Sequence, residues 1–173
     1  MAIKGKGYTK TSWSFEERPV PSAKLNTWDD RIELALELVH NLLSLAWGGG
    51  DGVIRKATTG DLAVVETPSP SLTAQVSPGY AFIARYPFRL DAPYNLPAIT
   101  PPALLPRIDL VVARLENWDA SVVTGTEASS PVAPNTPAGS LALARLFLRP
   151  GMTSIKNVND GINGYIVDVR TYL

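Results

Sequence analysis

The chain has 173 residues, 45% of them hydrophobic, and its 16 basic side chains balance 16 acidic ones. This length fits one domain with an arm or a small subdomain, and the composition allows a real core. The balanced charge gives no reason to expect nucleic-acid or anionic-membrane binding. No apolar run approaches the roughly 20 residues of a membrane span, and the absence of cysteine excludes a disulfide framework and thiolate chemistry.

Residues 1–24 predict an extended arm that packs on another surface. Glycines and prolines interrupt this segment, so it has no local core of its own. Trp13 and Phe15 are two residues apart and therefore face the same side of an extended chain. The surface that covers them is either the chain's own β domain or another subunit or protein. Residues 1–10 are polar and basic, so we expect no secretory signal.

The only long segment with helical periodicity runs from residue 25 to residue 47. Its apolar seam alternates steps of three and four residues, at Leu25, Trp28, Ile32, Ala35, Val39, Leu42 and Ala46. This heptad spacing is the pattern by which helices pack along each other. We expect Asn26 or Thr27 to cap the helix, with Asp29 and Asp30 in its first turn.

Leucines widen this seam on both flanks, at Leu36, Leu38, Leu43 and Leu45. So broad a face is too much for a two-stranded zipper and suits a trimer, or a helix pressed against its own domain and its copies. One amphipathic helix covering a sheet inside a monomer is the alternative. Four glycines within residues 48–52 end the helix and form a hinge. They do not form a phosphate loop, because the Gly-Lys-Ser/Thr ending is missing.

From residue 53 onward the hydrophobic pattern has a period of two. Strands are predicted over 53–57, 61–66, 71–77, 80–90, 107–115, 118–124, 141–149 and 165–170. Short strands separated by turn signals about every ten residues are typical of a β-sandwich or barrel. Residues 107–115 are apolar on both faces and should be the central strand, with 118–124 as its hairpin partner. Pro87 implies an edge position or a bulge. The predicted organisation is therefore a docking arm (1–24), an oligomerisation helix with its hinge (25–52) and a β domain (53–173).

The loop at 91–106 holds five prolines and several apolar side chains. Such a stiff loop covers either its own domain's open sheet or a partner surface.

Trp118 is expected in the core. The alternative is that it stacks on a host-surface glycan, together with Asn117 and Asp119.

We predict no catalytic, cofactor-binding or metal site. His40 is the only histidine, it follows the seam residue Val39, and one histidine without cysteine makes a zinc site improbable. It also lacks the serine of a nucleophile elbow nearby. Arg107 and Asp109 are expected to pair with cross-strand partners.

Several segments in the second half resemble a recurrent stretch of bacteriophage tail and baseplate proteins. The resemblance is carried, in order, by 76–81 (VSPGYA), 106–115 (PRIDLVVARL), 125–134 (GTEASSPVAP), 137–144 (PAGSLALA), 150–155 (PGMTSI) and the closing Asp168 and Arg170. It covers about residues 70–170. Asp168 and Arg170 share one face of their strand and should close the end of the domain by hydrogen bonds.

This resemblance implies a virion structural module, usually trimeric, without catalysis. It implies a homotrimer that contacts other virion proteins, is made in the host cytoplasm and resides in the virion. Many relatives carry a longer receptor-binding region, whereas this chain stops at Leu173. An adaptor, a baseplate collar piece, a capsid decoration protein or a head fibre therefore stay open, and a carbohydrate-binding module is the alternative of another class.

Overall fold

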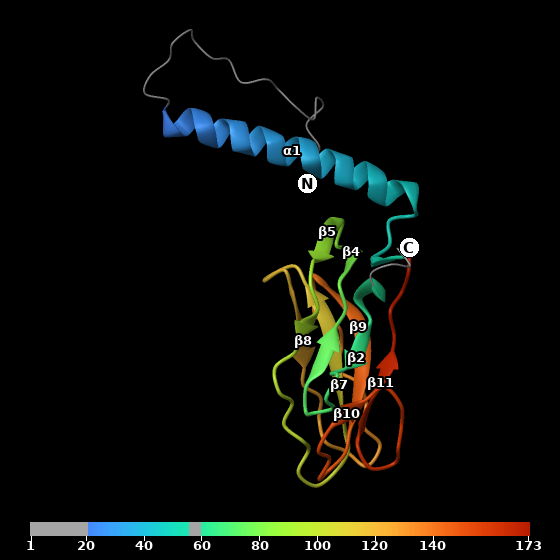
Figure 1. The fold of residues 1–173 in the computed structure, drawn as a ribbon. Coiled ribbons are helices and arrows are strands. Elements are labelled where there is room, and N and C mark those ends of the chain that lie inside the picture. Colours follow the sequence, from blue (N-terminus) through green and yellow to red (C-terminus); the bar gives the residue numbers. More distant parts are fainter. Residues whose placement is uncertain (1–20, 56–59) are drawn as a thin grey trace. The chain divides into compact units, whose positions relative to one another are not determined.

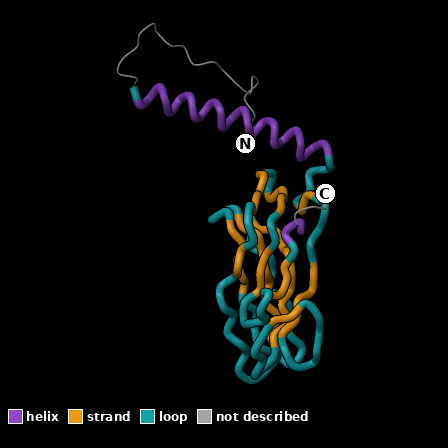
Figure 2. The backbone as a smooth tube through the Cα atoms, viewed as in Figure 1, coloured by secondary structure: helices purple, strands orange, loops and turns teal. Residues whose placement is uncertain are grey.

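The computed structural model describes residues 21–55 and 60–173, and Figures 1 and 2 show a long helix and a β-rich region. The chain divides into two compact units, Met1–Gly49 and Gly50–Leu173. The boundary lies inside the glycine run at 48–52. Over these described residues the predicted fold class is confirmed, because they are mainly β and one α-helix precedes the strands.

The helix α1 spans Ser22–Ala46 and so begins three residues before the predicted start. Ala23, Lys24 and Leu25 are good helix formers, and they extend the helix back to Pro21, which cannot continue it. Pro21 is extended, and its carbonyl accepts hydrogen bonds from the backbone N–H groups of Lys24 (3.0 Å) and Leu25 (3.3 Å).

The predicted cap at Asn26 or Thr27 is therefore wrong. The hydroxyl of Thr27 donates to the carbonyl of Ala23 at 2.8 Å, inside the helix, and no side chain caps the N-terminus. The first turn holds no acidic residue, so Asp29 and Asp30 lie farther along the helix than predicted.

Glycines end α1 as the sequence predicts. Gly48 and Gly49 have φ values of 88° and 78°, which glycine adopts without steric cost. The N–H of Gly49 donates to the carbonyl of Ser44 at 2.7 Å, so the last turn closes on itself.

Within the described residues, the strands of the β unit form three sheets. The first has the order β1-β4-β5, formed by Gly52–Ile54, Gly79–Ile83 and Tyr86–Leu90. The second has the order β2-β3-β6, formed by Val64–Glu66, Ala74–Val76 and Tyr94–Asn95. The third has the order β10-β11-β9-β7-β8, formed by Ile155–Lys156, Gly164–Asp168, Ser140–Leu148, Arg107–Arg114 and Asp119–Val123. Among the named strands of the described residues, β10 and β11 are the pair that run parallel, and an isolated parallel bridge joins Val53 to Tyr172.

The five-stranded sheet confirms two strand predictions. β7 lies between β9 and β8, as its two apolar faces predict, and β8 is its hairpin partner. The β7–β9 ladder shifts register between Val111 and Val112. A bulge of this kind bends and twists the strand locally.

The first two strands differ from the expected pattern. β1 pairs with β4 and β2 pairs with β3, so these two neighbours in sequence belong to different sheets. Residues 60–62 between them form a short 3₁₀ turn with Asp61 and Leu62 at positive φ.

The predicted strands 71–77 and 80–90 leave Gly79 between them, but Gly79 begins β4. A Cβ atom at Gly79 would lie 2.6 Å from the backbone nitrogen of Leu62, so this glycine permits a close backbone approach. Residues 80–90 form the β4–β5 hairpin rather than one interrupted strand. Pro87 does lie on the edge strand β5, as predicted.

One hydrophobic core joins the three sheets. It is formed around Leu62, Val76, Ile83, Phe88, Val111, Leu143, Leu146 and Ile155. In Figure 1, β4 passes in front of β7 and β9, and the buried side chains of these strands fill the layer between them. Leu96 and Ile99 of the proline-rich loop are buried in the same core, so this part of the loop covers its own domain.

Candidate assembly interface

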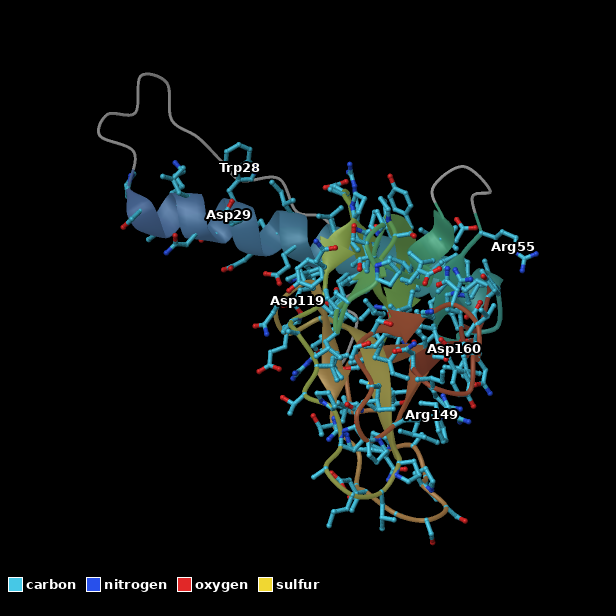
Figure 3. The ribbon with its side chains drawn as sticks, turned by 60° about the horizontal axis from the view of Figure 1, so that its bottom comes forward. Trp28, Asp29, Arg55, Asp119, Arg149 and Asp160 are labelled. Atoms are coloured by element: carbon cyan, nitrogen blue, oxygen red, sulfur yellow. The ribbon has the colours of Figure 1, made fainter. Side chains whose placement is uncertain are left out.

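The helix carries a stripe of large apolar side chains that are open to solvent. Five of the predicted seam residues are 38–59% exposed: Leu25, Trp28, Ile32, Val39 and Leu42. Ala35 is half-buried and Ala46 is exposed. Figure 3 shows Trp28 and Asp29 projecting from the ribbon of α1. We call the seven predicted seam residues, together with Leu36 and Leu43, the apolar stripe.

The spacing of the stripe follows the heptad geometry. Leu25, Ile32 and Val39 are seven residues apart and occupy the position called a, while Trp28 and Leu42 occupy d. In a helix of 3.6 residues per turn these two positions form one continuous line of side chains. Leu36 and Leu43 lie beside that line, are 52% and 44% exposed, and widen it to a face.

Exposure on this scale has an energetic consequence. Burying a large apolar side chain completely contributes about 1.5–3 kcal/mol, so covering the open half of each one contributes roughly 1 kcal/mol. Contiguous apolar surface of this kind on a soluble chain marks an interaction site. The stripe is therefore the strongest candidate for an interface in the described residues.

The predicted docking residues Trp13 and Phe15 lie outside the described residues, so the arm stays a prediction. Within the described part of the chain no group of three or more His, Cys, Asp or Glu side chains could hold a metal ion. In the same residues, the helix is not sufficiently long and apolar to cross a membrane.

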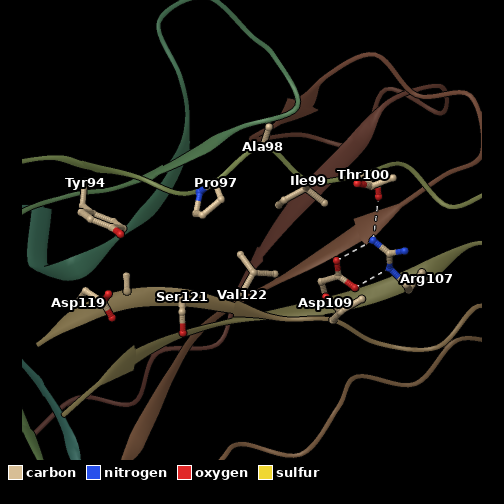
Figure 4. Close-up of a pocket in the computed structure, with 12 residues that line it drawn as sticks. Tyr94, Pro97, Ala98, Ile99, Thr100, Arg107, Asp109, Asp119, Ser121 and Val122 are labelled. Carbon is tan, nitrogen blue, oxygen red and sulfur yellow. Dashed lines mark hydrogen bonds and ion pairs between the residues drawn. The ribbon is translucent and has the colours of Figure 1, made fainter. Parts of the chain in front are cut away.

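In the β unit, an ion pair at the start of β7 ties three segments together (Figure 4). Arg107 Nε and Nη2 donate to the two carboxylate oxygens of Asp109 at 2.7 and 3.0 Å, and Nη2 also donates to the carbonyl of Thr100 at 2.9 Å. Asp109 is only 1% exposed and accepts the N–H of Gly125 at 2.9 Å. The expected cross-strand pairing is thus wrong, because the two side chains pair along one strand, where residues i and i+2 share a face.

A second carboxylate holds the loop before β7. Glu127 accepts the backbone N–H groups of Ala103, Leu104 and Leu105 at 2.8, 3.1 and 3.2 Å. These three hydrogen bonds hold the pKa of Glu127 below its usual range, because they favour the charged carboxylate. Leu104 remains 84% exposed, so this end of the proline-rich loop does not cover the domain.

The closing Asp168 and Arg170 form the hydrogen bonds that the sequence predicts at the end of the domain. Arg170 Nε and Nη2 donate to the carboxylate of Asp168 at 2.9 and 2.6 Å. Its Nη1 donates to the carbonyls of Gly60 and Asp61 at 3.0 and 2.7 Å. The hydrogen bond from Arg170 lowers the pKa of Asp168, and the same bond raises the pKa of Arg170. The pair fastens the C-terminal segment to the turn before β2.

Trp118 is not a core residue, contrary to expectation. It is 54% exposed, it lies at a positive φ of 54° between β7 and β8, and its ring stacks on the buried ring of Phe88 with centroids 6.5 Å apart. A hollow of about 470 Å³ lies nearby between β8 and the segment 94–100, and Asp119 and Tyr94 are among the residues that line it (Figure 4). Among the described residues, the buried Oδ1 atom of Asp119 has no hydrogen-bond partner.

Compared with models of known protein families, with curated proteins and with solved structures, the chain gives no significant match.

Sequence reasoning missed two features of these sites. The role of Glu127 depends on a loop more than twenty residues away, which local patterns do not reveal. The second feature is the set of charged residues that flank the stripe, Lys24, Asp29 and Arg31. The heptad register could have identified them, because they lie directly before an a position or after a d position.

Proposed function

We propose that the chain is a non-enzymatic structural component of a bacteriophage particle, a homotrimer of the tail or baseplate. The observation that carries this proposal is the exposed apolar stripe of α1 at heptad spacing. A trimer buries such a face on two neighbours at once, whereas a pair of helices leaves its leucine flanks in water.

The residues that carry the resemblance to phage proteins supply further support. Arg107, Asp109 and Gly125 hold one another, and Asp168 and Arg170 hold the turn before β2. Their hydrogen bonds connect segments that are distant in the sequence, and so they stabilise the fold of the β unit. A rigid unit attached to a self-associating helix suits a part that keeps other components in register.

The experiment is incorporation into particles of the phage that encodes the chain. An antibody against the β unit should label purified particles at one layer of the tail or baseplate. A variant with Ile32→Asn and Val39→Asn should be lost from the particles while its β unit stays folded. Particles without the chain would contradict the proposal, and labelling confined to the head would favour the alternative of a capsid decoration or head-fibre protein.

A carbohydrate-binding module is the second candidate, and Trp118 favours it. Its exposed ring, next to the unpartnered carboxylate oxygen of Asp119, provides a stacking face beside a hydrogen-bond acceptor. Binding to a glycan array that is lost on Trp118→Ala and kept on Val158→Ala, an exposed apolar residue of the β unit, would support it. An array on which the chain binds no glycan would contradict the carbohydrate-binding hypothesis.

A further inference from the structure

The open edge of β8 forms a second surface, separate from the apolar stripe. We propose that an extended segment of a partner protein binds along β8 as an added strand and places a lysine or arginine side chain against Asp119. The site lies wholly within the β unit, so it does not depend on the self-association proposed above.

The backbone of β8 has one side available for pairing. β8 is the last strand of the five-stranded sheet, with β7 as its neighbour. In the described part of the chain, the backbone groups of residues 119–123 form hydrogen bonds with β7 alone. In an antiparallel pair every second residue presents its N–H and C=O groups away from its neighbour. Such a row of backbone groups is a template for another strand.

The sequence of β8 does not block this edge. Pro87 lies on the edge strand β5 of the first sheet, where proline removes a backbone donor and so hinders pairing with another chain. Residues 119–123, in contrast, contain no proline and no lysine. They include Val122 and Val123, and β-branched residues of this kind favour strand pairing.

The hollow of about 470 Å³ lies directly beside this edge, between β8 and the segment 94–100. In Figure 4, Val122 points from β8 toward Ile99 on the opposite wall. The volume lies in the range of pockets that enclose ligands, about 300–1,000 Å³. The hollow therefore has room for a few side chains of a bound segment, and Val122 and Ile99 favour apolar ones.

Asp119 determines the charge of the bound segment. It lines the hollow, and its buried Oδ1 atom has no hydrogen-bond partner among the described residues. A buried carboxylate oxygen without a partner is unfavourable, and an ammonium or guanidinium group would supply the missing donor. The other charged side chains of the hollow, Arg107 and Asp109, bind each other. The site therefore favours a segment with a cationic side chain.

Pairing of β8 with β8 of a second copy fits these observations less well. In an antiparallel pair centred on Ser121, Asp119 of each copy would lie opposite Val123 of the other. Neither carboxylate would then meet a cation. A partner protein that supplies a lysine or arginine satisfies both the backbone edge and the carboxylate.

Peptide selection against the full chain tests the proposal. A library of short random peptides should yield binders that share alternating apolar residues and one lysine or arginine. A selected peptide should bind Asp119→Asn about tenfold more weakly, as expected for the loss of a hydrogen bond between charged groups. Asp91→Asn is the matched control and should not change the affinity, because Asp91 is exposed and lies outside the hollow.

Methylation of the peptide backbone tests the strand geometry without altering the protein. N-methyl groups on alternate residues remove the donors that face β8, so one of the two alternating patterns should abolish binding. The other pattern removes donors that face away from β8 and should weaken binding far less. Asp119→Lys should bind instead the peptide in which glutamate replaces the cationic residue, which also shows that this variant is folded.

Three results would each overturn the proposal: a library that yields no binder, binders unaffected by Asp119→Asn, and equal affinities of the two methylated peptides. Failure of the proposed function is measured separately. A monomeric mass of the unaltered chain would refute the homotrimer and would leave the expected peptide binding unchanged, because the site belongs to the β unit of each copy.

Discussion

At the scale of single residues, the tightest constraint lies at Gly125. A Cβ atom there would lie 2.0 Å from the carbonyl oxygen of Ile108, and the N–H of Gly125 is bound by the buried carboxylate of Asp109. A side chain must therefore displace the backbone or break the hydrogen bond.

We predict that Gly125→Ala destabilises the β unit by about 3 kcal/mol, the upper range for an overpacked site. Gly50→Ala is the matched control, because a Cβ atom at Gly50 would meet nothing within 4 Å. Urea unfolding followed by circular dichroism measures both variants. Equal midpoints for the two would show that the close approach is not a constraint.

Acid should release the loop that Glu127 holds. The hydrogen bonds from Ala103, Leu104 and Leu105 lower the folded-state pKa of Glu127, so its contribution to stability is full above the unfolded pKa of about 4.3. The contribution disappears as the pH falls through the lower folded pKa. Asp160 behaves in the same direction, because hydrogen bonds from Asn163 lower its pKa.

Glu127→Gln tests the direction of this pH dependence of stability. Above pH of about 5 the variant should be less stable than the unaltered chain, because an amide accepts these N–H groups less strongly than a carboxylate. The difference in the free energy of unfolding should shrink as the pH falls below about 4. A difference that stays constant through this range would mean that the carboxylate charge does not hold the loop.

At the scale of elements, the apolar stripe makes the clearest prediction. Ile32→Asn should weaken self-association strongly, because it places an amide in the middle of the seam. Glu33→Asn introduces the same side chain one position along, on the polar side, and should have little effect. Sedimentation velocity at matched concentrations compares the two variants. If both sediment like the unaltered chain, the stripe is not the interface.

Elements with strong local signals could be predicted from the sequence. The end of α1 follows from Gly48 and Gly49, whose left-handed backbone needs no distant partner. The central position of β7 follows from apolar residues on both its faces. In each case one segment carries the whole signal.

Elements fixed by distant contacts could not be predicted. The β4–β5 turn uses Ala84 and Arg85 at positive φ, where a hairpin usually has Asn or Gly. The carboxylate of Asp51, 33 residues away, accepts the N–H of Ala84 at 2.8 Å. This distant contact holds the turn, so the turn residues themselves do not have the usual turn sequence. Arg107 and Asp109 likewise pair along their own strand because Gly125 and Thr100 complete the group.

At the scale of the whole molecule, the two units should be separable. All members of the hydrophobic core lie within Gly50–Leu173, so this unit has what it needs to fold by itself. We predict that residues 50–173 alone are folded and monomeric at concentrations where the full chain associates. Circular dichroism and light scattering measure the two properties. An unfolded fragment would show that the helix unit contributes to the core, and an associated one would place an interface on the strands.

The proposed assembly requires that other copies of the chain cover the apolar stripe. Sedimentation equilibrium of the full chain measures this most directly, because the mass it reports does not depend on shape. We expect three times the chain mass of 18.6 kDa, falling to one chain mass when Ile32→Asn and Val39→Asn are combined. A single chain mass for the unaltered protein at micromolar concentration and above would contradict it.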